Sequence, residues 1–392
     1  MIAVALGLLL APASTVTVED RTEARGRIVA AGEGAADLET QPTVRLDVRG
    51  RHGADTLALA VAPRLVLTRP EGSSVRGEAL ALASLRLDVE RRRVRVLAQQ
   101  AFAYGAVSAG TLLVQPRTAP GEVPASPFPF PLDGRVLFTL LSSQSAVGVG
   151  YALSPRLAVS ASASYFVYGG PDPESRRQLA LSSGPSAEAR LDAHLTRRDD
   201  AAAVVGARYT RLQFELQPGP SSSQGFGEAR LRHRFSRLTW AEAGAGATVQ
   251  AVEGFATSLY PSGDAALVTA FQQRSAHGEL AFVARTGPWL NIFTGAVSQR
   301  VEGIVAARWV FGRNTLFAES AAQSTVGVTG VGEYRLLLGS AGYGRALSRQ
   351  LSVDVGVRAG VQEVETCAAR AEVLQLSAVV GLRYAAVPWR LR

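Results

Sequence analysis

Apolar and polar residues alternate strictly over long stretches of this chain, and this period of two most constrains its fold. In the segment 351–361 every odd position is aliphatic and every even position is polar, charged or glycine. The segments 157–167 and 187–196 repeat the pattern. Because successive side chains of a strand point to opposite faces, each segment predicts a strand with one apolar and one polar face. Helical periodicity is nearly absent.

The alternating segments predict about 18 antiparallel strands, within a range of 16–18. Short turns at 153–156, 197–200, 235–237, 312–314 and 347–350 are separated by longer links at 169–185, 218–224, 254–263 and 363–370. An even strand number with alternating short and long connections is typical of a transmembrane β-barrel. The predicted strands span 22–31, 40–50, 55–68, 76–90, 92–104, 143–153, 156–168, 186–197, 201–216, 226–236, 238–252, 264–275, 278–286, 301–311, 315–325, 332–346, 350–364 and 371–385.

The segments 146–159 and 379–384 resemble strands of the porin-like outer-membrane β-barrels of Gram-negative bacteria. This resemblance of pattern covers nearly the whole mature chain. It implies a single closed barrel with short periplasmic turns and longer extracellular loops, embedded in outer-membrane lipid and inserted by the barrel assembly machinery. It also implies interfacial aromatic girdles near the strand ends. The candidates are Tyr151, Tyr165, Tyr209, Phe235, Trp309, Phe311 and Tyr384.

The ends and one internal segment depart from the strand pattern. The apolar run 2–11 is too short to span a bilayer as a helix, and Ala11 and Ala13 form a small-x-small cleavage pattern. We therefore expect a signal peptide at residues 1–13 and a barrel over 14–392. The proline-rich stretch at about 106–133 predicts a long loop, because proline removes ladder donors. An exposed extracellular loop and a constriction inside the lumen are both compatible with it.

All 41 basic residues are arginines, since the sequence contains no lysine. In a barrel, alternation turns the apolar face toward lipid and the polar face toward the lumen. An arginine excess there would raise the local concentration of anions and favour small anionic solutes. The trio Arg230, Arg232 and Arg234 beside Glu228 is the best single candidate for a basic strip, although an arginine–carboxylate ladder that only joins strands fits equally well. The candidate lumenal residues are Arg190, Arg208, Arg230, Arg232, Arg234, Arg358 and Arg383.

Signals for enzymatic, cofactor or metal chemistry are missing from the sequence. Cys367 is the single cysteine, and the four histidines show no metal-ligand spacing. His233 is predicted to face lipid, but Phe235 stands where the His-x-Ser pair of outer-membrane phospholipases has serine. Gly244 and Gly246 sit within an alternating strand and are expected at close-packing positions. We predict no catalytic residues, no cofactor and no metal, and the arginines at strand spacing argue against nucleic acid as a partner.

Four functions therefore stay open. The leading hypothesis is a channel for passive diffusion of small, anion-biased solutes. The second is a structural or surface-binding barrel whose lumen is blocked by loops and salt bridges. A lipid-modifying barrel enzyme would need a His/Ser or His/Asp pair within hydrogen-bond reach on one outer face. A secreted soluble β-solenoid or sandwich is the fourth.

Overall fold

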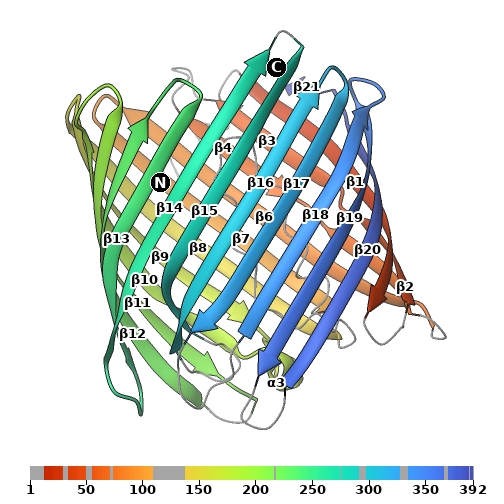
Figure 1. Cartoon of the computed structure of the whole chain (residues 1–392), viewed down its shortest axis with the longest axis horizontal. Coiled ribbons are helices and arrows are strands. Elements are labelled where there is room, and N and C mark those ends of the chain that lie inside the picture. The colour runs from red at the N-terminus through yellow and green to blue at the C-terminus, as the bar shows by residue number, and fades with distance from the viewer. Residues whose placement is uncertain are drawn as a thin grey trace.

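The chain forms a closed antiparallel β-barrel of 18 strands in a computed structural model (Figure 1). The barrel closes because the last long strand, β20 (Arg370–Ala385), pairs with the first, β1 (Ala13–Val29), from Glu19↔Ala385 to Val29↔Gln375. No helix among the described residues is long and apolar enough to cross a bilayer. The structure describes all residues except 1–12, 30–33, 50–54, 71–73, 109–136, 216–217, 274, 291–296, 327–333, 366–369, 388 and 392.

Three of the 18 strands are interrupted, so 21 labelled segments make up the sheet. The second strand consists of β2 (Gly34–Thr40) and β3 (Thr43–Arg49), which both pair with β1. The third consists of β4 (Thr56–Val61) and β5 (Arg64–Pro70), which both pair with β6 (Arg76–Arg91). Pro42 and Pro63 lie at these two breaks, because proline has no N–H for the ladder. The short segment β21 (Trp389–Leu391) continues β20 along β1.

Each of the remaining strands pairs with the strand before it and the strand after it in the sequence. They are β7 (Val94–Ser108), β8 (Leu137–Ser154), β9 (Leu157–Gly169), β10 (Leu181–His194), β11 (Asp199–Gln213), β12 (Pro218–Arg234), β13 (Thr239–Val252), β14 (Ser258–Gln273), β15 (Ala276–Leu290), β16 (Val297–Phe311), β17 (Asn314–Val326), β18 (Tyr334–Ala346) and β19 (Leu351–Glu365).

The predicted fold class and strand number are confirmed, but several predicted loops are wrong. β10, β12 and β14 begin inside the expected loops at 169–185, 218–224 and 254–263. Proline and glycine suggested loops there, yet each of these strands accommodates its proline. Pro185 pairs with Tyr165 of β9 and is skipped in the ladder to β11, so no donor is required of it. β7 likewise continues through Ser108, and the rest of the expected 106–133 loop lies outside the described residues.

The two ends of the barrel differ, as the alternating connection lengths predicted. Short turns such as 155–156 and 312–313 lie at the end where β1 begins and β20 finishes. The connection between β9 and β10 lies at the opposite end and contains the short helix α3 (Pro173–Gln178), at the bottom of Figure 1. We call these the short-turn end and the long-loop end. The predicted signal peptide remains a prediction, since residues 1–12 lie outside the described residues.

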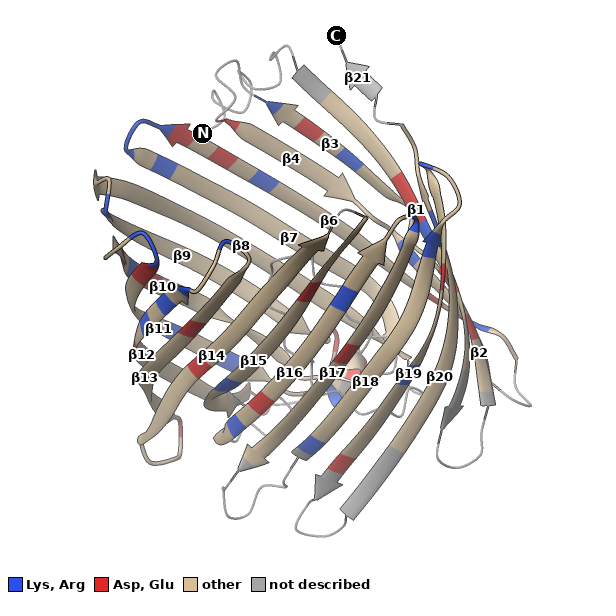
Figure 2. Cartoon of the chain, turned by 45° about the horizontal axis from the view of Figure 1, so that its top comes forward, with Lys and Arg blue, Asp and Glu red and all other residues tan. Residues whose placement is uncertain are grey.

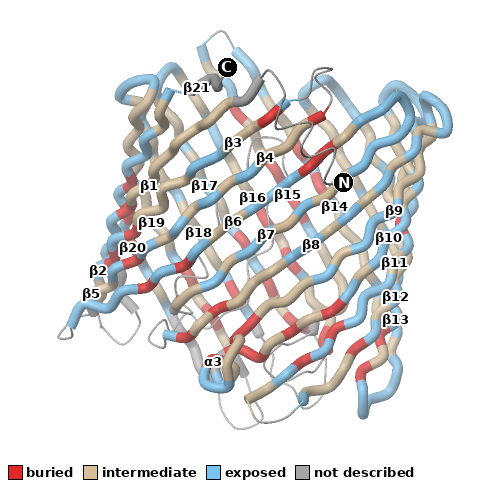
Figure 3. The backbone as a smooth tube through the Cα atoms, turned by 180° about the vertical axis from the view of Figure 1, so that it is seen from behind, coloured by how far each residue is buried: buried red, intermediate tan, exposed pale blue. Residues whose placement is uncertain are grey.

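The outer surface is apolar, and exposed positions alternate with less exposed ones along the strands (Figure 3). Val147, Val205 and Leu231 are more than half exposed, which is costly for a wall facing water. Six of the seven predicted girdle aromatics are strongly exposed, and Phe311 is partly exposed. Tyr151 lies at the short-turn end, opposite Val94 of β7, and Tyr104 lies ten residues further along β7 toward the long-loop end. The aromatic levels at the two ends are therefore about 33 Å apart along the strand. At the usual tilt this is about 25 Å along the axis, the height of a lipid-facing band.

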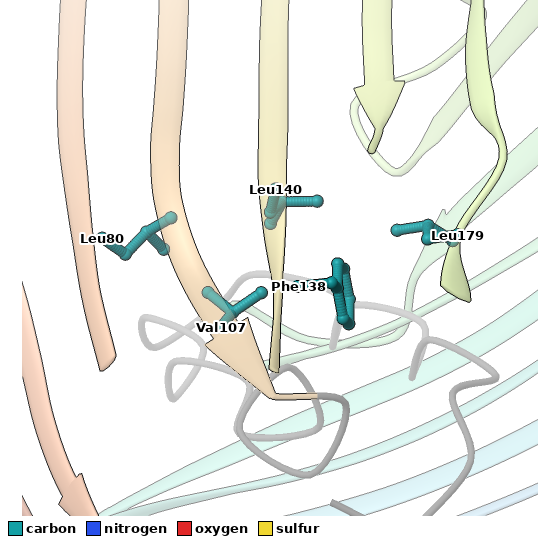
Figure 4. Close-up of a cluster of buried hydrophobic side chains, with 5 residues drawn as sticks. All are labelled: Leu80, Val107, Phe138, Leu140 and Leu179. Carbon is teal, nitrogen blue, oxygen red and sulfur yellow. The ribbon is translucent and has the colours of Figure 1, made fainter. Parts of the chain in front are cut away.

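Helix α3 is fastened to the barrel at the long-loop end. The Asp172 carboxylate accepts hydrogen bonds from the backbone N–H of Ser175 (2.9 Å) and from its hydroxyl (2.9 Å), and the Ser175 hydroxyl accepts one from the N–H of Thr139 on β8 (3.0 Å). Leu179, just after α3, is buried against lumen-facing residues of β6 to β8, so the connection folds inward over the barrel wall. Figure 4 shows this cluster of Leu80, Val107, Phe138, Leu140 and Leu179.

We expect Asp172→Ala to loosen α3. Loss of an N-cap costs about 1 kcal/mol, so local opening and trypsin cleavage after Arg176 or Arg177 should accelerate about fivefold. Hydrogen bonding from the Ser175 N–H lowers the pKa of Asp172 below its ordinary value. The cap therefore contributes fully above the ordinary aspartate range and is lost only as pH falls through the lowered pKa. The Glu174→Ala variant in the same turn is the control, and equal cleavage of both variants would contradict the capping role.

Candidate functional site: a lumenal arginine ladder

Five of the predicted arginines form a row down the lumenal face of β10, β11 and β12. Arg190 stands opposite Val204, Arg230 opposite Ala202 and Arg232 opposite Asp200, while Arg208 lies on β11 itself. Arg234 is one pair beyond Arg232 along β12. Counted along β11, the row covers about ten residues, or roughly 33 Å of strand. We call Arg208, Arg190, Arg230, Arg232 and Arg234 the arginine ladder; charged positions gather on these strands in Figure 2.

The pleat accounts for the direction of these side chains. The residues between them, Leu191, Val205 and Leu231, are the exposed apolar residues of the outer wall. Because adjacent side chains of a strand point to opposite faces, the arginines face the lumen. A one-residue slip in register would turn the arginines outward and the apolar residues into the lumen. The apolar outer wall therefore fixes the register that places the arginines on the lumenal face.

Four of the five ladder arginines are paired with carboxylates. The guanidinium of Arg190 lies 2.8 Å from Asp192, and that of Arg234 lies 3.2 Å from Asp200. Arg232 lies 2.8 Å from Glu242 and 4.2 Å above the ring of Trp240, which adds a cation–π contact. The arginine–carboxylate interpretation of the Arg230–Arg232–Arg234 trio therefore describes its contacts correctly. These side chains remain between about one third and one half exposed, so they still present donors to the lumen.

Arg208 differs from the rest of the ladder. It is exposed, its cross-strand neighbours are Ser186 and Gln224, and no ion pair joins it to a carboxylate in the described part of the chain. It also lies nearest to the long-loop end of the five.

The other two candidates, Arg358 and Arg383, lie away from the ladder and close the barrel. Arg383 on β20 lies 2.8 Å from Glu19 of β1. Arg358 on β19 reaches across β20 to within 3.9 Å of Glu23, which is 2 % exposed. Both link the last strands of the chain to the first one, so their contacts stabilise the closure of the barrel.

Arg230 belongs to a cluster that the sequence did not reveal in full. Its Nε lies 2.6 Å from Glu228 and 3.5 Å from Asp264, a residue two strands away on β14. Gly244 of β13 lies between β12 and β14 at this level, and a Cβ there would collide with the carboxylate oxygens of both acids. The missing side chain is what allows the three charged groups to meet. At Gly246 a Cβ would collide with the backbone carbonyl of Gly227, so both glycines occupy the close-packing positions that the sequence predicted.

A second charged group continues the same row across β15 and β16. Glu302, 2 % exposed, lies 4.0 Å from Arg285 and 3.6 Å from Arg300. Sequence alternation did not single out these arginines, because the lumenal wall beside them is apolar and both faces of the strands then look alike. Ala266, Val283, Ile304 and Ala321 form this buried wall, against which Trp240 packs.

Among the described residues, the outer face carries one His/Asp pair, the feature that a lipid-modifying enzyme would need. The Nδ1 of His233 lies 2.6 Å from the carboxylate of Asp199, and the ring stacks edge-on against Phe235 at 4.7 Å between centroids. The hydroxyl of Thr196 donates to Asp199 and not to His233. Among the described residues no hydroxyl is hydrogen-bonded to the His233 ring, so the nucleophile of such a site is missing from them.

Comparison with known proteins finds likeness in solved structures only. No protein-family profile matches the chain, and no curated protein matches its sequence. The solved outer membrane protein OpdK of Pseudomonas aeruginosa is 11% identical, with 96% of this chain and 99% of that chain covered and a TM-score of 0.47. OccK5 (OpdH) of the same organism is 12% identical, covers 95% and 98%, and has a TM-score of 0.46. OpdK with vanillate is 12% identical, covers 96% and 99%, and has a TM-score of 0.45.

The two lumenal glycines give a matched prediction. We expect Gly244→Ala to fold, because the Glu228 and Asp264 side chains can move aside, but to separate them from Arg230 and so change the ion selectivity. Gly246→Ala should disrupt folding instead, since backbone cannot move aside cheaply. Heat-modifiable migration on gels reports the closed barrel for both. Equal folding yields for the two variants would contradict the packing described.

Proposed function

We propose that the chain is an outer-membrane channel through which small solutes diffuse passively, with a weak preference for anions. A closed barrel satisfies every strand hydrogen bond within the protein, which is the condition for a sheet to lie in a bilayer. The apolar outer wall and its two aromatic girdles support that location, and bacterial barrels of this kind belong to the outer membrane.

The arginine ladder is the observation that carries the proposal. Its members follow one another at intervals of two to four residues, or about 7 to 13 Å along the strand. This spacing is close to the screening length of salt at physiological strength, so an anion would rarely be beyond the field of a guanidinium. The bias is weak because Asp192, Glu228, Glu242 and Asp200 neutralise most of the ladder. Arg208, with no such partner, contributes most of the excess.

The barrel with a blocked lumen is the second candidate. It is supported by the same ion pairs and by the inward fold of the α3 connection over the wall. Conduction separates the two, because a blocked barrel inserts into a bilayer without current steps. The enzyme hypothesis keeps only the His233–Asp199 pair and is not favoured.

The test is single-channel recording of the purified chain in planar bilayers under a KCl gradient. We expect stable current steps and a reversal potential on the anion-selective side. Arg208→Gln should lower the anion-to-cation permeability ratio about twofold, the effect of one charge at roughly 5 Å in screened water. Arg211→Gln, three residues along β11 on the outer face, is the control and should leave the ratio unchanged. An aromatic carboxylate such as vanillate serves as a test solute.

Silence of the wild-type protein, with normal heat-modifiable migration, would reject the channel and support the blocked barrel. A selectivity that is unchanged in Arg208→Gln would retain the channel and reject the ladder as its source.

A further inference from the structure

The short turns of the barrel are rich in arginines that have no role in the proposed channel. Of the eight connections at the short-turn end, six carry arginine, and the other two, between β3 and β4 and between β14 and β15, are described only in part. Together the six turns contain eight arginines, which we call the arginine rim. They are Arg92, Arg93, Arg156, Arg197, Arg198, Arg237, Arg313 and Arg349.

Within the described residues the rim is only slightly neutralised, through the electrostatic interaction of Arg198 with the adjacent Asp199. The six turns contain no aspartate or glutamate, and no rim arginine forms an ion pair with a carboxylate in the described residues. The acids next to the turns are engaged elsewhere: Asp55 with Arg91, Asp199 with His233, and Asp200 with Arg234. The opposite end differs, because its α3 connection mixes Glu174 with Arg176 and Arg177. Among the described connections, the six turns of the short-turn end are thus more positive than the α3 connection.

The rim also surrounds most of the barrel. Its turns join strands from β6 to β19, and blue segments recur on the turns at the end where β1 begins and β20 finishes (Figure 2). Neighbouring strands are about 4.8 Å apart, so successive turns follow at about 10 Å and their screened fields overlap. A protein partner would contact one side of such a ring. A partner that fits all of it must itself surround the barrel.

The adjacent girdle identifies that partner. Tyr151, Phe235 and Trp309 lie on the outer face close to the same turns and are 42%, 57% and 47% exposed. Aromatic side chains of this kind mark the level of lipid headgroups, and arginine extends its charged end into that layer. The guanidinium donates two parallel hydrogen bonds to a phosphate, which makes phosphate its best-matched anion there.

We propose that the arginine rim binds the headgroup phosphates of the phospholipid leaflet at the short-turn end and sets the depth of the barrel in the bilayer. The proposal rests on the membrane location proposed above but not on conduction. Anionic phospholipids should bind more tightly than zwitterionic ones, and salt should weaken the difference.

The experiment uses the full chain purified in zwitterionic detergent, with phosphatidylglycerol or phosphatidylcholine added to the micelles. Bound lipids are counted by native mass spectrometry. The test variant combines Arg156→Gln, Arg237→Gln, Arg313→Gln and Arg349→Gln, and a second variant carries lysine at the same positions. Arg211→Gln, on the outer face at the other end, is the control.

We expect the glutamine variant to bind phosphatidylglycerol at least about tenfold more weakly than wild type, with phosphatidylcholine binding little changed. The lysine variant should retain part of the difference, because charge remains without the bidentate geometry. Heat-modifiable migration must be normal in each variant for its binding to count. Equal phosphatidylglycerol binding by wild type and the glutamine variant would overturn the proposal, as would an equal loss in Arg211→Gln. A silent channel that still binds phosphatidylglycerol through the rim would refute conduction alone.

Discussion

Backbone hydrogen bonding in a medium without water is the constraint on which this structure depends. Each unpaired N–H or C=O in hydrocarbon costs several kcal/mol, so a spanning sheet has no acceptable edge. The pairing of β1 with β20 removes the edges, and the Glu19–Arg383 and Glu23–Arg358 contacts reinforce it from the lumenal side. Closure in turn requires every strand to present one face to lipid.

The lumenal chemistry follows from that requirement. With Leu191, Val205 and Leu231 turned outward, the residues between them must face inward, and many of these are charged. Charges inside a barrel of this kind are stable only where they are hydrated or paired, and most of the ladder is both partly exposed and paired. The ion pairs of Arg230, Arg232 and Arg234 with Asp264, Glu242 and Asp200 connect different strands of the sheet, whereas Arg190 and Asp192 pair within β10. The Arg230 trio therefore makes the predicted arginine–carboxylate contacts, and its role as a basic strip stays a prediction.

Strand number, strand direction and facing were predictable from the sequence because each depends on a period of two. The beginnings of β10, β12 and β14 were not, since Pro185, Pro218 and Pro261 suggested loops. Pro185 is skipped in the ladder to β11, while Pro218 and Pro261 stand opposite Gln213 and Ala247 within their ladders. Cross-strand partners were also beyond the sequence. Asp264 reaches Arg230 from two strands away and only because Gly244 has no side chain. Arg285 and Arg300 were not predicted as lumenal residues, because the lumenal wall around Ile304 is apolar and the two faces of these strands look alike in the sequence.

The most direct test is a cysteine scan of β11 in a background where Cys367 is replaced by alanine. Single cysteines at positions 202 to 208 would be probed in reconstituted vesicles with a charged, water-borne maleimide and with a lipid-soluble one. Positions 202, 204, 206 and 208 should react with the aqueous reagent, and positions 203, 205 and 207 with the lipid-soluble reagent only. Uniform labelling along the strand, or the opposite phase, would contradict a barrel that turns the arginine ladder to its lumen.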